Sequence, residues 1–233
     1  MERLDKVISS QTNYSRRDVK ELVRSKKVLV NGEIVKNSDI KVDTSKDIIT
    51  IDNAVLQIKK YIYLMLNKPK GYVSATDDKR FATVLELVPE EYSHRDLFPA
   101  GRLDKDTTGL MIITDDGVFA HNILSPSKHI SKTYKVTIDI PVTKEMVLGF
   151  IEGIKLNDGV CKPSTLKIVD KYNAIVVLTE GRYHQIKRMF GCFGTKVIEL
   201  KRIAMGNFNL PTDLEEGQCR EFTKEELSKV TLK

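Results

Sequence analysis

The sequence predicts an α+β fold with a mixed, mainly antiparallel sheet. Apolar runs typical of buried strands occur at residues 61–66, 110–113 and 175–178. Segments with helical spacing and capping residues lie before and between these runs. Strands and helices do not alternate regularly, as they would in a parallel sheet, so the pattern indicates α+β rather than α/β.

Composition and length are those of a globular chain. The 233 residues suffice for one large core, or for a small domain attached to a larger one. They include no apolar stretch long enough to cross a bilayer, and residues 1–6 lack the apolar core of a signal peptide. Cys161, Cys192 and Cys219 lie far apart and indicate neither a disulfide framework nor a zinc site. We therefore expect a cytoplasmic protein.

The charge distribution points to a polyanionic partner. The net charge is +6 and the pI is about 9.0. Residues 16–27 and residues 180–202 each contain six basic and two acidic side chains. Two separate basic clusters predict two contacts on one nucleic acid.

Residues 1–60 are predicted to form two helices followed by short strands. Ser15 with Asp18 is the capping signal of the second helix, and an Asn-Gly pair marks a hairpin turn. The expected elements, in order, are a helix from Leu4, a helix after Ser15, a hairpin at residues 28–35, strands at 40–42 and 48–51, and a linker at 52–60.

The remainder of the chain mixes strands and helices. The strand at residues 61–66 is expected to stop at 67–71, where proline and glycine gather, and Thr143 and Thr223 are predicted helix caps. The other expected elements are a loop at 74–82, a short helix at 83–87, a strand at 110–113 ended by a turn at 115–117, a strand at 133–138, a helix through 146–151, a strand at 175–178, a helix entered after 181 and a helix at 225–230.

Asp104 is the first candidate for chemistry. It lies between Arg102 and Lys105 on the loop that enters the strand at 110–113, and a carboxylate on such a loop is well placed to react. Two other interpretations are a polar turn before a core strand and a calcium-binding loop. The calcium loop would use Asp104, Asp106, Thr108, Gly109 and Asp115. It needs a helix on each side, however, and here the flanking residues are β-like.

The first 50 residues resemble the small RNA-binding domain of the alpha-L, or S-four, type. The resemblance rests on the Arg-Leu-Asp-Lys opening, the Ser-Arg-Arg capping segment and the Val-Asn-Gly-Glu-Ile-Val hairpin. It implies that the basic helix contacts RNA through Arg16, Arg17, Lys20 and Lys27. The alternative is an ordinary solvated basic helix.

Four further stretches resemble the ribosomal pseudouridine synthases, and their order and spacing make the resemblance specific. They lie at residues 66–71, 100–104, 132–134 and 180–189. The resemblance implies two domains, an RNA-binding domain with its linker at 1–58 and a catalytic domain at 59–233. Lysine at position 187 and the short segment after the last predicted helix favour the small-subunit branch of the family.

The resemblance also implies a reaction and the residues that perform it. A uridine of RNA is detached at its glycosidic bond, turned and rejoined through a ring carbon, which needs neither a cofactor nor a metal. Asp104 matches the catalytic aspartate, Lys187 the cation beside it, and Tyr134 the tyrosine that stacks on the target base. Burial favours the neutral form of a carboxyl group, and an adjacent fixed cation opposes this.

RNA contacts near the reacting base are expected from the same motifs. The target base leaves its helix at a cost of roughly a few kcal/mol, and Arg102 could fill the vacated space or hold the neighbouring phosphate. No Ser or Cys nucleophile is evident beside His184, so we do not assign it as a general base. The side chains expected to line the RNA path are Arg102, Arg182, His184, Gln185 and Arg188.

We therefore expect a monomeric cytoplasmic enzyme that modifies a specific uridine of 16S rRNA in the small subunit or its assembly intermediate. Two alternatives remain at this point. One is a pseudouridine synthase acting on 23S rRNA or tRNA, and the other is a non-catalytic RNA-binding ribosome assembly factor.

Overall fold

The computed structural model describes residues 1–231, which form two compact units. The N-terminal unit comprises Met1–Tyr61 together with Val88–Asp96, and the C-terminal unit comprises Ile62–Leu87 and the chain from Leu97 onward. Asn13 Nδ2 donates a hydrogen bond of 3.2 Å to the carbonyl oxygen of Glu90, which attaches the second segment to the first within the N-terminal unit. Within the described range, no helix is long and apolar enough to span a lipid bilayer.

The N-terminal unit packs two helices against short strands. Its elements are β1 (Glu2–Arg3), α1 (Leu4–Gln11), α2 (Arg16–Arg24), β2 (Val28–Val30), β3 (Glu33–Ile34), β4 (Lys41–Val42), β5 (Ile49–Ile51), β6 (Ala54–Val55) and the 3-10 turn η2 (Glu90–Tyr92).

The predicted start of α2 is confirmed. Ser15 Oγ accepts a hydrogen bond from the backbone of Asp18, whose carboxylate accepts one from the backbone of Ser15. The predicted hairpin is also confirmed, with Asn31 and Gly32 at positive φ between β2 and β3.

The predicted linker at 52–60 was partly wrong, because it contains β6, which pairs with β5. Asp52 and Asn53 both adopt positive φ and form a second hairpin turn. Without a glycine, this turn carried no sequence signal as strong as that of Asn31-Gly32.

The C-terminal unit is built on one large sheet. Its elements are β7 (Tyr63–Lys68), η1 (Val84–Leu87), β8 (Phe98–Pro99), β9 (Thr108–Thr114), α3 (Gly117–Leu124), η3 (Pro126–Lys128), β10 (Lys132–Ile138), α4 (Lys144–Glu152), β11 (Lys155–Leu156), β12 (Gly159–Val160), β13 (Thr165–Ile168), β14 (Asn173–Leu178), α5 (Gln185–Gly191), β15 (Val197–Met205), β16 (Phe208–Asn209), β17 (Cys219–Glu221) and α6 (Lys224–Thr231).

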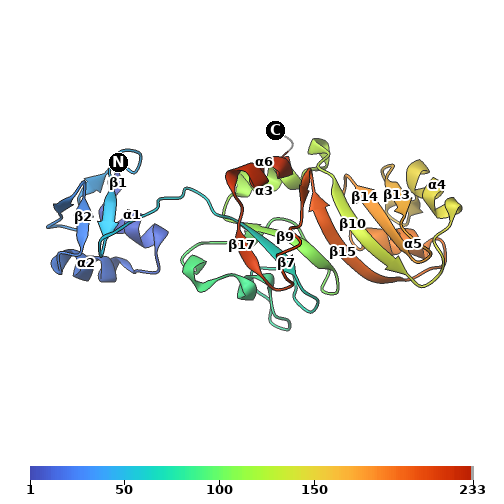
Figure 1. The fold of residues 1–233 in the computed structure, drawn as a ribbon, viewed down its shortest axis with the longest axis horizontal. Helices are drawn as coiled ribbons and strands as arrows, with labels where there is room; N and C mark the ends of the chain where they lie inside the picture. The colour runs from blue at the N-terminus through green and yellow to red at the C-terminus, as the bar shows by residue number, and fades with distance from the viewer. Residues whose placement is uncertain (232–233) are drawn as a thin grey trace. The chain divides into compact units, whose positions relative to one another are not determined.

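The sheet confirms the predicted α+β class. Its main strand order is β13-β14-β10-β15-β9-β7-β17, and Figure 1 shows these strands running through the C-terminal unit. β9 and β15 pair in parallel, whereas the other strand ladders described for this sheet are antiparallel. A mixed, mainly antiparallel sheet is what the irregular order of elements predicts.

Two hydrophobic cores fill the C-terminal unit. One lies between β7, β9 and the helices α3 and α6, which lie side by side in Figure 1. The other lies between β10, β14 and the helices α4 and α5. β15 contributes Leu200 to the second core and Met205 to the first, so this strand connects the two halves of the sheet.

Among the features of this unit that differ from expectation, three have an identifiable cause. β15 was not predicted, because Glu199, Lys201 and Arg202 interrupt its apolar pattern. The segment at 115–117 was expected to be a turn, but Asp116 caps α3 by accepting hydrogen bonds from the backbone of the next turn. β7 continues through Lys68 instead of stopping at residue 66, because Asn67 Nδ2 and Lys68 Nζ each donate a buried hydrogen bond to a backbone carbonyl oxygen.

Gly109 permits the parallel pairing of β9 with β15. It has a φ of +98°, and a Cβ there would overlap the backbone oxygen of Arg202.

Gly109→Ala is therefore expected to separate the two strands and lower the free energy of unfolding by several kcal/mol. Gly71→Ala is the matched control, since Gly71 has a φ of +97° but nothing within 4 Å of its Cβ position. Gly71→Ala should therefore cost only the strain of a non-glycine residue at positive φ, about 1–2 kcal/mol. Urea unfolding compares the two, and equal losses would contradict the close approach.

Candidate active site

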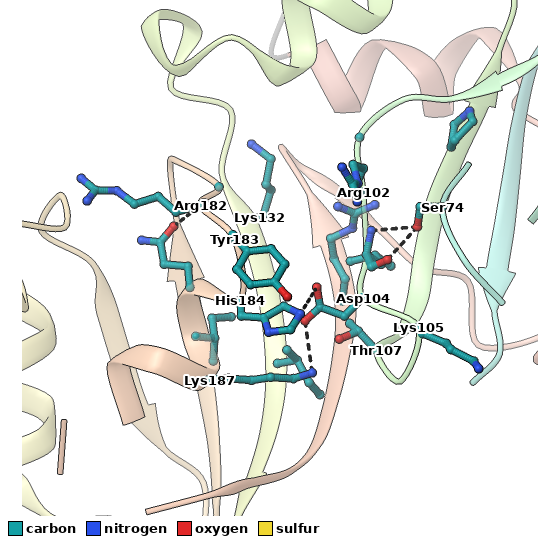
Figure 2. Close-up of a pocket in the computed structure, with 18 of the residues that line it drawn as sticks. Ser74, Arg102, Asp104, Lys105, Thr107, Lys132, Arg182, Tyr183, His184 and Lys187 are labelled. Atoms are coloured by element: carbon teal, nitrogen blue, oxygen red, sulfur yellow. Dashed lines mark hydrogen bonds and ion pairs between the residues drawn. The ribbon is translucent and has the colours of Figure 1, made fainter. Parts of the chain in front are cut away.

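A cavity of about 850 Å³ lies in the C-terminal unit, within the range of roughly 300–1,000 Å³ that is usual for ligand sites. Its walls come from the loop before β9, the segment before and at the start of α5, strands β10 and β15, and the loop after β7. The lining includes Arg102, Asp104, Tyr134, His184 and Lys187. Figure 2 shows the labelled side chains that line it.

Asp104 contacts two side chains from the distant segment around α5. Its Oδ2 lies 3.1 Å from Nζ of Lys187, and its Oδ1 lies 3.4 Å from Nε2 of His184. Figure 2 shows both side chains directed at the carboxylate. The structure thus brings Asp104, Lys187 and His184 together, although the sequence separates them widely.

Lys187 lies between two carboxylates. Its Nζ is 2.6 Å from Oδ1 of Asp106, closer than to Asp104. Burial by itself would lower the pKa of Lys187, but the hydrogen bonds to Asp106 and Asp104 outweigh it and raise that pKa. Partial burial likewise works to raise the pKa of Asp106, and the hydrogen bond and charge of Lys187 reverse this and lower it. The ammonium therefore stays charged beside Asp104 at neutral pH.

Lys68 holds the loop that carries Asp104. Its side chain is fully buried, and Nζ donates hydrogen bonds to the carbonyl oxygens of Pro69, Lys105 and Thr107 at 3.0, 3.3 and 2.8 Å. Burial lowers the pKa of this lysine from 10.5 to about 8. The sequence signal was present, since a lysine directly follows an apolar strand and precedes a proline, but sequence analysis missed its role.

The same loop is attached on its other side. Ser74 Oγ donates to the carbonyl oxygen of Leu103 at 2.8 Å and accepts from its backbone N–H at 2.9 Å. Lys105 Nζ lies 3.4 Å from the centroid of the Phe81 ring, a cation–π contact. The position of Asp104 is therefore fixed by contacts on both sides of the loop.

Two further cations on adjacent strands line the cavity. Lys132 on β10 and Arg202 on β15 are both buried. Arg202 Nε donates to the carbonyl oxygen of Leu110 at 2.7 Å, and Lys132 Nζ donates to that of Ile130 at 3.2 Å. Burial first, and then the charge of Arg202, lower the pKa of Lys132 to about 8. Neither residue was singled out as a site residue from the sequence.

Three predicted RNA contacts are occupied within the protein. Arg182 donates to the carbonyl oxygens of Gly159 and Val160, and Arg188 pairs with Asp158, so both reach the hairpin β11–β12. Gln185 is buried and donates to Glu180 at 2.7 Å. Arg182 and Gln185 line the cavity, and Arg188 is not among its lining residues. These contacts position the segment that carries His184 and Lys187.

The other predicted site residues lie as follows. Tyr134 on β10 lines the cavity and packs against the core between β10, β14 and α5. Arg102 is exposed and also lines the cavity. In the N-terminal unit Arg16, Arg17 and Lys20 are exposed on α2, and Lys27 forms an ion pair of 3.0 Å with Asp52.

The calcium-loop interpretation does not fit the structure. Thr108 and Gly109 belong to β9, and Asp115 accepts a hydrogen bond from the backbone of Ile62. Asp104 and Asp106 face the ammonium of Lys187. Across residues 1–231, no group of three or more His, Cys, Asp or Glu side chains is placed to hold a metal ion.

Comparison with known proteins decides the family. A family model described as RNA pseudouridylate synthase matches residues 62–191, which is more than half of the chain. The chain belongs to the RNA pseudouridylate synthase family. An S4 domain model matches residues 2–49, so the resemblances seen in both parts of the sequence are confirmed.

Relatives match almost the entire chain. Ribosomal small subunit pseudouridine synthase A of Escherichia coli (strain K12) is 41% identical over 98% of this chain and 99% of its own length. The protein of the same name from Yersinia pestis is 40% identical over 98% and 97%. An uncharacterized RNA pseudouridine synthase of Bacillus subtilis (strain 168) is 39% identical over 97% and 96%.

One solved structure agrees in fold. A crystal structure of a pseudouridylate synthase superposes with a TM-score of 0.70 at 39% identity, covering 99% of this chain and 100% of that one. The expected fold and the expected enzyme class, an isomerase of the pseudouridine synthase type, are both confirmed.

The pKa of Lys132 predicts how stability depends on pH. Its folded-state pKa is about 8, below the ordinary 10.5. Below pH 8, Lys132 is protonated in both the folded and the unfolded protein, and the free-energy cost of burying its charge is fully present. Between pH 8 and 10.5, Lys132 stays protonated only in the unfolded protein. The free energy of unfolding therefore rises with pH over this range, by about 3 kcal/mol at most.

Urea unfolding at pH 7.5 and pH 10 tests this. Lys132→Met should stabilise the protein more at pH 7.5 than at pH 10, relative to the wild type. Lys135→Met is the control, because Lys135 is exposed on the same strand. A difference between Lys132→Met and the wild type that does not change with pH would show that the buried lysine does not titrate in this range.

Proposed function

We propose that this protein converts a specific uridine of 16S rRNA, in the small ribosomal subunit or its assembly intermediate, to pseudouridine. The observation that carries the proposal is the carboxylate of Asp104, held between Lys187 and His184 in the wall of the cavity. Relatives named for the small subunit match nearly the full length of the chain, which supports this choice of RNA over 23S rRNA or tRNA.

The reaction conserves atoms. The target uridine leaves its helix, at a cost of roughly a few kcal/mol, and enters the cavity. The bond between N1 and the sugar breaks, the base turns, and a bond forms between C5 and the same sugar carbon. C5 loses a proton and N1 gains one, so there is no change of oxidation state and no step that requires a cofactor.

Asp104 is the catalytic carboxylate in this proposal. An ionised carboxylate can attack the sugar, add to the base or remove a sugar proton, and each of these roles requires it beside the bond that breaks. Lys187 is the adjacent cation that stabilises the negative charge of the carboxylate. Tyr134 on β10 stacks on the target base from within the cavity.

Binding of the RNA uses two domains in this proposal. Residues 1–58 form the RNA-binding domain with its linker, and residues 59–233 form the catalytic domain of a cytoplasmic monomer. Arg102 and His184 contact the RNA near the cavity, and α2 holds phosphates through its exposed basic side chains. Arg182, Gln185 and Arg188 contribute chiefly by positioning the segment before α5, because their polar groups contact the protein.

Asp104→Asn is expected to lower turnover by at least about 10²–10⁴-fold while RNA affinity changes only a few-fold, because the amide keeps the shape but cannot act as nucleophile or base. Release of tritium from RNA labelled at C5 of uridine measures turnover. Asp106→Asn is the matched control, since it removes the other carboxylate at Lys187 and should keep most of the activity. Turnover by purified Asp104→Asn, free of host enzyme, would exclude this role for Asp104.

The basic segment is tested by replacing Arg16, Arg17 and Lys20 of α2, together with Lys27 just after it, with glutamine. We expect weaker binding to 16S rRNA, with the slope of log K against log salt reduced by about one unit for each lost phosphate contact. The effect should fall on KM more than on kcat. The control replaces the same number of basic side chains, Lys6, Lys36, Lys41 and Lys46, which are exposed elsewhere in the same unit. If both variants bind alike, α2 is an ordinary solvated face.

A further inference from the structure

Tyr183 is an exposed aromatic side chain at the catalytic cavity. It is 75% exposed, more than any other large hydrophobic residue of the C-terminal unit in the described chain. It also lines the cavity, next to the residue that contacts Asp104. A tyrosine ring left in water at such a place contributes little to folding, because it buries little apolar area.

The ring is held in a defined position. Tyr183 and His184 stack with ring centroids 3.9 Å apart and an interplanar angle of 16°. Figure 2 shows the two rings over each other beside Asp104. One face of the tyrosine therefore rests on the imidazole, and the exposure of the residue leaves the opposite face open.

The backbone at His184 is strained in the conformation that makes this stack. His184 has a φ of +48° and a ψ of +34°, the left-handed region, and its side chain makes no capping hydrogen bond to α5. A residue other than glycine costs of order 1–3 kcal/mol there, and such strain persists where the surroundings hold it. Here it turns the imidazole toward Asp104 and places Tyr183 on the outer side of that ring.

We propose that Tyr183 is the stacking platform for an unpaired nucleobase of the RNA next to the target uridine. Proteins that bind unpaired RNA stack its bases on aromatic side chains, because every base has a π-face. The ring pair already has the spacing and near-parallel geometry of such a stack, and a base on the open face would extend it to three rings. The inference rests on the proposed function, since it assumes an RNA uridine as the target.

Tyr134 and Tyr183 lie at different depths, so the target base and the neighbouring base have different stacking partners in this proposal. Tyr134 is half-buried and packs against the core, so a base that reaches it has entered the cavity. Tyr183 lies on the exposed side of His184. A base stacked on Tyr183 therefore lies at the open edge of the cavity and belongs to a different nucleotide from the base that reaches Tyr134. Flipping the target leaves its neighbours with an unstacked face, and the platform would replace the lost stacking.

The absence of tryptophan from the sequence offers a direct test. Tyr183→Trp introduces a single indole, whose emission should be quenched in a saturable way by a hexauridylate RNA. A hexamer of abasic ribonucleotides, which has the phosphates but no bases, should leave the emission unchanged. Tyr172→Trp is the control, because Tyr172 is 40% exposed in the same unit and does not line the cavity.

Kinetics with 16S rRNA provides the second measurement. Tyr183→Ala should raise KM by about 5- to 150-fold, the loss of one base stack, and leave kcat nearly unchanged. Tyr183→Phe keeps the ring and should restore the wild-type KM. A merely structural role would not give this split together with rescue by phenylalanine.

The possible outcomes separate the two proposals. Equal quenching of the indoles at 183 and 172, or quenching by the abasic hexamer, would overturn the platform. So would a fall in kcat without a rise in KM, which would place the ring on the reacting base instead. If the wild type released no tritium from 16S rRNA, the proposed function would fail, whereas the fluorescence measurement with hexauridylate would still decide whether Tyr183 stacks on bases.

Discussion

The ion pair between Asp104 and Lys187 is the contact that the fold of the C-terminal unit has to bring about. Its two residues lie on segments that follow different paths, one on the loop before β9 and one in the first turn of α5. They meet because β9 pairs with β15, β15 with β10, and α5 packs on the core beneath β10 and β14. Gly109 is needed for this arrangement, since only a residue without a Cβ allows β9 to approach Arg202 so closely.

The same requirement accounts for the buried cations around the loop. Taking an ammonium or guanidinium group out of water costs several kcal/mol, and the hydrogen bonds of Lys68 to three carbonyl oxygens offset only part of this. The lowered pKa values of Lys68 and Lys132 express that cost. The loop that carries Asp104 is thereby held by the buried ammonium of Lys68, and Lys132 and Arg202 add positive charge to the lining of the cavity.

Local signals in the sequence predicted local structure well. The capping pairs Ser15 with Asp18 and Thr223 with Glu226 are present as expected, and the run at 110–113 is buried along its whole length. β15 was missed because a buried Arg202 reads as a surface residue, and its environment depends on strands distant in sequence.

Prediction of the site residues depended on the family resemblance more than on the spacing of residues in the sequence. No periodicity places Lys187 at Asp104, since only the folded sheet brings them together. The resemblance also pointed to Arg182, Gln185 and Arg188 as RNA contacts, and their bonds to Glu180 and to the hairpin β11–β12 depend on tertiary structure that the motif does not describe. Tyr183 lay within the same motif, but its exposure and its stack on His184 required coordinates.

The most direct test of the central claim is to map pseudouridine at single-nucleotide resolution in the ribosomal RNA of cells that lack this protein. The account predicts that one pseudouridine of 16S rRNA disappears, that the wild-type chain restores it, and that the Asp104→Asn chain does not. Loss of a site in 23S rRNA or tRNA instead, or an unchanged set of pseudouridines, would contradict it.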